Sequence, residues 1–244
     1  MTDVTIRRRE LFAPAEIRSL YQLHSRFFLN ASWESFAADF AEKQWVIEIQ
    51  IDHTPVGFST IAVQEMVWKS RPLVCLFSGD TIVDPAHWQA NALIPAFGKF
   101  ILYCNERYPD ALIVWHLISK GYRTYRLLPV FFHEYFPRPG VPTPGPVQEL
   151  LDHLSVSRFN GHYDGKTGIV RFDGDTDYLC DQLAEVLESR RSDPHIRFFL
   201  ERNPGYRRGD ELSCLTDMAK ENLKPAALRM VARSRVSWVT GEHP

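Results

Sequence analysis

The residues best suited to chemistry follow two apolar runs. The first run, Leu73–Phe77, leads into Ser78-Gly-Asp-Thr81, and the second, residues 111–118, leads into Ser119. If both runs are β-strands, these polar groups lie at strand ends, where ligands gather in open sheets. Asp80 is suited to orient a base or an amine, and it is equally suited to cap a turn.

A helix with a capped N-terminus is predicted after the first run and the polar residues that follow it. Asp84 is suited to cap it, and Pro85 fits the first helical position. The apolar periodicity continues to about Arg107, and Pro95 predicts a kink or a late start. The N-terminus of a helix favours anions, because its N–H groups and its dipole point at them.

A third group of candidates follows Ser119. The group contains Tyr122, Arg123, Tyr125 and Arg126, and its two arginines are suited to bind an anion by bidentate contacts. A solvated helix face with aromatic packing explains the same residues. His116 lies inside the second apolar run, where we favour a core histidine with satisfied hydrogen bonds over a catalytic base.

The rest of the chain supplies the elements that position these residues. We expect a strand over 4–12, a helix over 13–28, a second helix capped by Asn30 or Ser32 and ending near Glu42, and a hairpin of 45–51 with 56–63. Residues 65–71 are predicted to be a polar connection. After a proline-rich segment, 137–146, we expect a helix over 147–155, a hairpin over 158–172 and a helix over 177–190, followed by a helical and irregular tail.

The predicted order is strand, two helices, hairpin, strand, helix, strand, helix. This order, with Val83-Asp-Pro85 before a helix, resembles the Gcn5-related N-acetyltransferase (GNAT) superfamily over residues 4–137. In that superfamily a basic residue and a glycine-rich turn hold the pyrophosphate of coenzyme A. Here the corresponding positions are Trp88-Gln-Ala-Asn-Ala-Leu93, without glycine, so the turn is degenerate.

The resemblance implies roles for individual residues. It places the acyl donor against the strand end and the turn that follows, and the reacting groups on the strand ends and the next helix. The implied donor-binding residues are Thr81, Ile82, Val83, Gln89, Ala90, Asn91 and Ala92, and the implied catalytic residues are Asp80, Ser119, Tyr122 and Tyr125. Neither tyrosine falls on a certain motif match.

Composition bears on whether the protein binds nucleic acid, a membrane or a metal ion. The net charge of −2 gives no support to nucleic-acid binding, and no apolar stretch is long enough to span a membrane. The four cysteines are far apart and no histidine spacing is typical of a metal site, so we expect no metal. Without a secretory signal pattern at the N-terminus, we expect a cytoplasmic protein; a homo-oligomer is compatible with the sequence.

These observations predict an α/β (α+β) fold: a GNAT-like mixed central sheet flanked by helices, with a C-terminal extension. The core is expected over 1–137, a proline-rich linker or loop over 138–146, and a hairpin with helices over 147–244 that either completes the domain or stands apart. The function implied is transfer of an acyl group to an amine of a small molecule or protein. Acyl-coenzyme A or an acyl carrier protein would be the donor. The alternative is a non-catalytic binding or assembly module with an occluded donor site.

Overall fold

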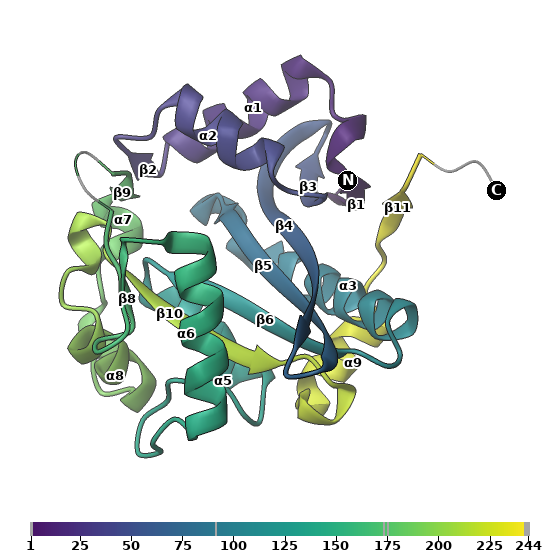
Figure 1. Cartoon of the computed structure of the whole chain (residues 1–244). Helices are drawn as coiled ribbons and strands as arrows, with labels where there is room; N and C mark the ends of the chain where they lie inside the picture. The colour runs from purple at the N-terminus through teal and green to yellow at the C-terminus, as the bar shows by residue number, and fades with distance from the viewer. Residues whose placement is uncertain (1, 91, 173, 175, 242–244) are drawn as a thin grey trace. The chain divides into compact units, whose positions relative to one another are not determined.

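The structure is a computed structural model that describes residues 2–90, 92–172, 174 and 176–241. The chain divides into two compact units, and Figure 1 labels their helices and strands. Unit 1 comprises the residues up to Arg26, residues 32–114 and those from Met218 on, and unit 2 comprises Phe27–Ala31 and Trp115–Asp217. The domain boundaries expected near residues 137 and 147 do not coincide with this division.

Unit 1 is built on a mixed, mostly antiparallel sheet. Its strand order is β11-β1-β3-β4-β5, and only the pairing of β1 with β11 is parallel. The strands are β1 (Thr2–Arg8), β3 (Trp45–Ile51), β4 (Thr54–Trp68), β5 (Arg71–Val83) and β11 (Ser237–Val239).

Two tight hairpins connect β3, β4 and β5. The residues between the strands, Asp52-His53 and Lys69-Ser70, all have φ between 46° and 65°. Such turns match the twist of paired strands. The polar connection expected over 65–71 is therefore wrong. The outer part of this hairpin is mostly exposed, which explains why its sequence is polar although it is strand.

Helices cover both faces of the unit 1 sheet. The ring of Trp45 contacts Phe100 of α3 at 5.6 Å between centroids, and Phe58 contacts Phe36 of α2 at 6.2 Å. Phe58 pairs with Glu48, three residues beyond Trp45, so Trp45 and Phe58 point to opposite faces. Figure 1 shows α3 and α9 side by side. The helices are α1 (Pro14–Ser25), α2 (Trp33–Ala41), α3 (Leu93–Arg107) and α9 (Pro225–Arg233).

Unit 2 contains the strand order β6-β10-β8-β7 and a separate antiparallel pair, β2 with β9. The strands are β6 (Leu112–Ser119, in this unit from Trp115), β10 (Glu211–Asp217), β8 (Ile169–Val170), β7 (Tyr163–Asp164), β2 (Phe28–Leu29) and β9 (Tyr178–Leu179). The helices are α4 (Tyr122–Tyr125), α5 (Leu127–Phe131), α6 (Gly145–Phe159), α7 (Asp181–Ala184) and α8 (Pro194–Arg202).

The described residues also form short 3₁₀ helices: η1 (Arg9–Leu11), η2 (Pro85–Ala90), η3 (Glu188–Arg190), η4 (Tyr206–Arg208) and η5 (Lys220–Asn222). The predicted fold class, a mixed sheet flanked by helices, is confirmed, and so is the order of elements up to residue 125. The helix expected over 177–190 is wrong: this segment forms β9, α7 and η3. The strand β10 was not predicted.

Candidate functional site

A β-bulge in β5 positions Asp80. The pairing between β4 and β5 shifts by one residue, so that Gly79 and Asp80 on β5 both lie opposite Thr60 on β4. A bulge of this kind bends a strand and re-aims the side chains beside it. The carboxylate Oδ1 of Asp80 lies 3.3 Å from Nε2 of His24 on α1. The bulge is the local feature that brings Asp80 beside His24, and the catalytic role of Asp80 stays a prediction.

His24 and Asp80 form an acid–base pair with limited contact to solvent. The side chain of His24 is 3% exposed and that of Asp80 is 20% exposed. A carboxylate beside an imidazole orients the ring, with one ring nitrogen facing the carboxylate. The pair is therefore suited to accept a proton from a bound group.

A second ionic pair, Asp39 with Lys43, lies at the C-terminal end of α2. Nζ of Lys43 donates a hydrogen bond to the Asp39 carboxylate and another to the Asp39 carbonyl oxygen, at 3.1 Å, and the Lys43 side chain is fully buried. Burial raises the pKa of the Asp39 carboxyl, and the charge of Asp80 acts in the same direction, while the Lys43 ammonium opposes both. Asp39 and Asp80 are thus coupled electrostatically, with one buried cation beside them.

Gly79 makes room for this arrangement. A Cβ atom at residue 79 would lie 2.5 Å from Cε of Lys43 and 2.7 Å from Oγ1 of Thr60. Carbon atoms of real side chains do not approach so closely, so the lysine stem passes β5 only because residue 79 has no side chain.

The end of β5 carries three of the predicted donor-binding residues. The hydroxyl of Thr81 donates to the Gly79 carbonyl oxygen at 3.0 Å and contacts the Ser59 hydroxyl at 2.7 Å. Ile82 is buried and Val83 is partly exposed. The side chain of Thr81 is therefore held within unit 1 before any ligand arrives.

The segment after β5 differs from a simple helix start. Asp84 caps η2, because its Oδ1 accepts a hydrogen bond from the Ala86 N–H at 3.0 Å, as predicted, and its Oδ2 accepts one from Arg26 at 2.9 Å. The helix α3 itself begins at Leu93, which confirms the late start expected from Pro95.

The turn between η2 and α3 holds the remaining predicted donor-binding residues. Gln89 and Ala90 lie in η2, Ala92 is the N-cap of α3, and Asn91 lies outside the described residues. Nε1 of Trp88 donates a hydrogen bond to the carbonyl oxygen of Val83 at 2.9 Å, so the indole folds back on the strand end. The role of this turn in donor binding stays a prediction.

The other predicted catalytic residues belong to unit 2 and are packed there. Ser119 is fully buried and donates to the Gly121 carbonyl oxygen at 3.0 Å. The Tyr122 hydroxyl donates to the Glu185 carbonyl oxygen at 3.4 Å, and that of Tyr125 to a carbonyl oxygen at 3.0 Å. Burial raises the pKa of Tyr125 well above its ordinary value, which makes its hydroxyl a weaker acid. Their catalytic roles stay predictions.

Sequence reasoning missed His24, Asp39 and Lys43. Two signals pointed to them: His24 interrupts an otherwise apolar helix face, and Asp39 precedes Lys43 by four residues, the spacing of a helical ion pair. Both signals are common in ordinary helices, so neither identifies a site without the bulge beside it.

Two further structural facts concern the described residues. No helix within them is long and apolar enough to cross a lipid bilayer. Nor do three or more of their histidine, cysteine, aspartate and glutamate side chains meet in a group that could hold a metal ion.

Comparisons with known proteins give distant likenesses. No family model matches the chain, and no curated protein does. A probable N-acyltransferase of Enterococcus faecalis is 14% identical with a TM-score of 0.41; the match covers 55% of this chain but only 33% of that protein. The ribosomal-protein-S18-alanine N-acetyltransferase of Escherichia coli is 14% identical with a TM-score of 0.39, over 59% of this chain and 85% of that one.

An acetyltransferase of Trypanosoma brucei is 19% identical with a TM-score of 0.36, and the match covers 57% of this chain and all of that one. All three proteins are named as acyltransferases or acetyltransferases. With TM-scores below 0.5, these likenesses do not assign the chain to a family.

Proposed function

We propose that this protein is a divergent GNAT-type acyltransferase that moves an acyl group from a thioester to an amine. The observation that carries the proposal is the His24–Asp80 pair on the bulge of β5, three residues before Val83-Asp-Pro85. The element order on which the resemblance rests is present in the fold, from β1 through α1, α2, β3, β4, β5, α3 and β6 to α4.

The charges of unit 1 fit an amine as the acceptor. An aliphatic amine is an ammonium ion at neutral pH, and the coupled carboxylates of Asp39 and Asp80 attract a cation. The amine attacks only after it loses a proton, and the His24–Asp80 pair would accept that proton. Its nitrogen then bonds to the thioester carbonyl carbon, the carbon–sulfur bond breaks, and the departing thiolate takes up a proton.

The resemblance assigns protonation of the thiolate to a tyrosine. The candidates are Tyr122 and Tyr125, and burial raises the pKa of Tyr125. A weaker acid donates a proton less readily.

The donor is acyl-coenzyme A or an acyl carrier protein. Without glycines, the turn after β5 offers less access to its backbone N–H groups, and Trp88 already bonds to the Val83 carbonyl oxygen. An acyl carrier protein depends less than coenzyme A on a pyrophosphate site within this fold. It therefore remains a candidate donor.

Calorimetric titration with acetyl-coenzyme A and with a longer acyl-coenzyme A tests the proposal. We expect saturable binding at micromolar concentrations of at least one of them, weakened by Gln89→Glu because the added carboxylate repels phosphate. Release of free thiol in the presence of a panel of amines then measures turnover.

Asp80→Asn is the decisive variant. We expect it to bind the donor as the unmodified protein does but to turn over about 10²- to 10⁴-fold more slowly, the usual contribution of a positioned base. Asp3→Asn, an exposed carboxylate on β1, is the matched control. If Asp80→Asn turns over as fast as the unmodified protein, Asp80 does not take part in accepting the proton. A lack of binding to either coenzyme A thioester and to an acylated carrier protein would leave a non-catalytic module.

A further inference from the structure

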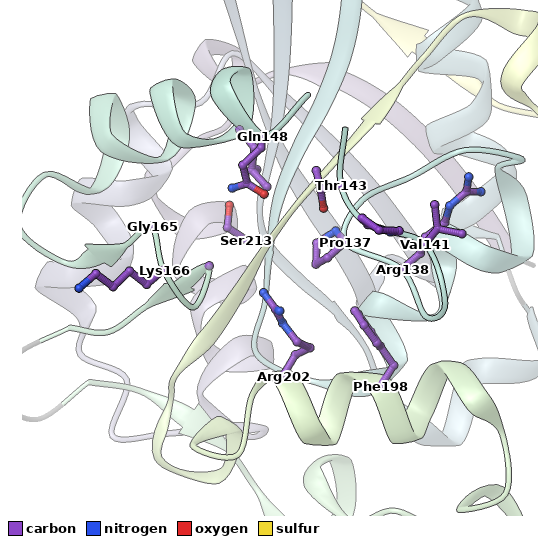
Figure 2. Close-up of a pocket in the computed structure, with 13 residues that line it drawn as sticks. Pro137, Arg138, Val141, Thr143, Gln148, Gly165, Lys166, Phe198, Arg202 and Ser213 are labelled. Carbon is purple, nitrogen blue, oxygen red and sulfur yellow. The ribbon is translucent and has the colours of Figure 1, made fainter. Parts of the chain in front are cut away.

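Unit 2 contains a cavity of about 300 Å³ that is separate from the residues discussed above. Figure 2 shows its lining. The residues come from the loop before α6, from α6 and α8, from the turn between β7 and β8, and from β10. A volume of 300 Å³ is at the lower end of the range for small-molecule sites.

The lining carries positive charge only. Arg138, Lys166 and Arg202 line the cavity, and none of its lining residues is an aspartate or a glutamate. Arg138 is compensated by Glu134, at 3.7 Å. Within the described part of the chain, Arg202 makes one hydrogen bond, to the Thr167 carbonyl oxygen at 2.8 Å, and no ion pair.

Polar groups converge on the middle of the cavity. In Figure 2 the guanidinium of Arg202 points upward into it from α8, while the side chains of Thr143 and Gln148 point toward it from the opposite side. The Gln148 amide nitrogen is held by Asp152 at 2.8 Å, which fixes the side chain and leaves its oxygen available. Lys166 and Arg138 extend away on either side, where they add to the potential without filling the space.

The floor of the cavity is polar but uncharged. The hydroxyl of Ser213 bonds to Nε2 of His116 at 3.1 Å and to the Ser155 hydroxyl at 2.8 Å. Burial lowers the pKa of His116 to about 3, so this ring is neutral at physiological pH. The positive potential of the cavity therefore comes from its arginines and its lysine.

Apolar side chains provide the remaining wall. Pro137, Val141, Leu151 and Phe198 line the cavity, and Figure 2 places Phe198 beside Arg202 on α8. A ligand with an apolar part would gain from leaving water here, and an anionic group would gain from Arg202.

We propose that this cavity binds a small organic anion, in which a phosphate or carboxylate at Arg202 and Thr143 is joined to an apolar group against Phe198 and Pro137. An arginine without a carboxylate partner is suited to such a group, because its planar fork of donors matches both phosphate and carboxylate. The proposal stands independently of acyl transfer, since it uses none of the residues given a role there.

Calorimetric titration of the full chain with phenyl phosphate tests the proposal, with benzoate as the carboxylate probe. Phenol, without the anion, and inorganic phosphate, without the ring, are the control ligands. We expect phenyl phosphate or benzoate to bind saturably at one site and more tightly than either control. The tighter of the two anions shows which group the cavity prefers.

Arg202→Met should weaken binding at least tenfold, and Thr143→Val, a second variant of similar shape, should weaken it less. Arg197→Met is the matched control, because Arg197 is an exposed arginine on the same helix that does not line the cavity. Binding that is absent for both anions would overturn the proposal, as would equal affinity in Arg202→Met and the unmodified protein.

Discussion

At residue 79 the strand β5 has no space for a side chain. We predict that Gly79→Ala lowers the free energy of unfolding by about 1–3 kcal/mol, as for other overpacked sites, because the new methyl group collides with Lys43 and Thr60. The midpoint of urea unfolding measures the change. A displaced Lys43 would also uncover Asp39, so donor-dependent turnover should fall with it.

Gly145→Ala is the control for this substitution. No atom lies within 4 Å of a Cβ at that position, which is the first residue of α6. Alanine there should be neutral or stabilise by up to about 1 kcal/mol, because it restricts the unfolded chain. If the two variants unfold at the same urea concentration, the close packing around Gly79 is not as described.

His116 makes stability depend on pH. Its pKa is about 3 in the folded protein and about 6.5 in an unfolded chain, so between these values the unfolded state binds one more proton. Above about pH 6.5 His116 does not reduce the free energy of unfolding. As the pH falls from 6.5 toward 3, this free energy decreases by at most about 1.4 kcal/mol per pH unit. Urea midpoints measured between pH 7 and 4.5 should show this slope.

In His116→Asn the slope should become shallower over that range, whatever the absolute loss of stability. His53→Asn is the matched variant, in an exposed turn with a φ of 63° that asparagine accepts. An unchanged slope in His116→Asn would show that His116 takes up a proton while folded.

Residue patterns predicted part of the candidate site. Asp80 could be singled out because it follows an apolar run, and His116 was correctly interpreted as a core histidine. The contact of Asp80 with His24 depends on a bulge and on the packing of α1, neither of which is written in the local sequence. A side chain 56 positions away along the chain gives no periodic signal.

At the scale of elements, α2 is stabilised by its N-cap, Ser32. The hydroxyl of Ser32, one of the two N-caps that the sequence allowed, accepts a hydrogen bond from the Ser35 N–H at 3.1 Å. Ser32→Ala should cost about 1 kcal/mol, because the Ser35 N–H loses its only side-chain acceptor. Ser19→Ala in the middle of α1 should be neutral, since that hydroxyl bonds only to the carbonyl oxygen of Ala15. Thermal unfolding of both variants checks the difference.

Elements with periodic patterns were predictable, and elements shaped by partners were not. Six of the seven residues of β10 are buried, so it shows no alternation. Its polar residues are satisfied across the fold, Ser213 by His116 and Thr216 by the Glu134 carbonyl oxygen at 2.7 Å. In the sequence these residues indicate a loop, because their partners lie far away along the chain.

The prediction of a helix over 177–190 was wrong for a related reason. Its apolar residues have helical spacing, but β9 pairs with β2, and the Cys180 N–H bonds to the Phe27 carbonyl oxygen at 2.9 Å. Pairing with a strand 150 residues earlier overrides a local helical preference. The exposed Leu187 shows that the expected apolar face has no partner there.

At the scale of the whole molecule, the chain passes between the two units four times. Unit 1 therefore contains both the first residues described and the last ones. The C-terminal segment contributes α9, which packs on α3, and β11, which pairs with β1. Sequence alone placed this segment in an extension after residue 147, because nothing local indicates a return to the N-terminal strands.

We predict that a chain ending at Asp217 is markedly less stable than one ending at Ser234, which keeps α9 and lacks β11. Val231 fits against Gly98 so closely that a Cβ there would lie 2.2 Å from it, and burying one valine contributes about 1.5–3 kcal/mol. The loss of β11 removes one edge pairing and the ring contacts of Trp238, whose side chain is partly exposed. Urea unfolding followed by far-ultraviolet circular dichroism should therefore rank the full chain first, the chain ending at Ser234 close behind and the chain ending at Asp217 last. Equal midpoints for the two shortened chains would show that α9 contributes nothing to the stability of unit 1.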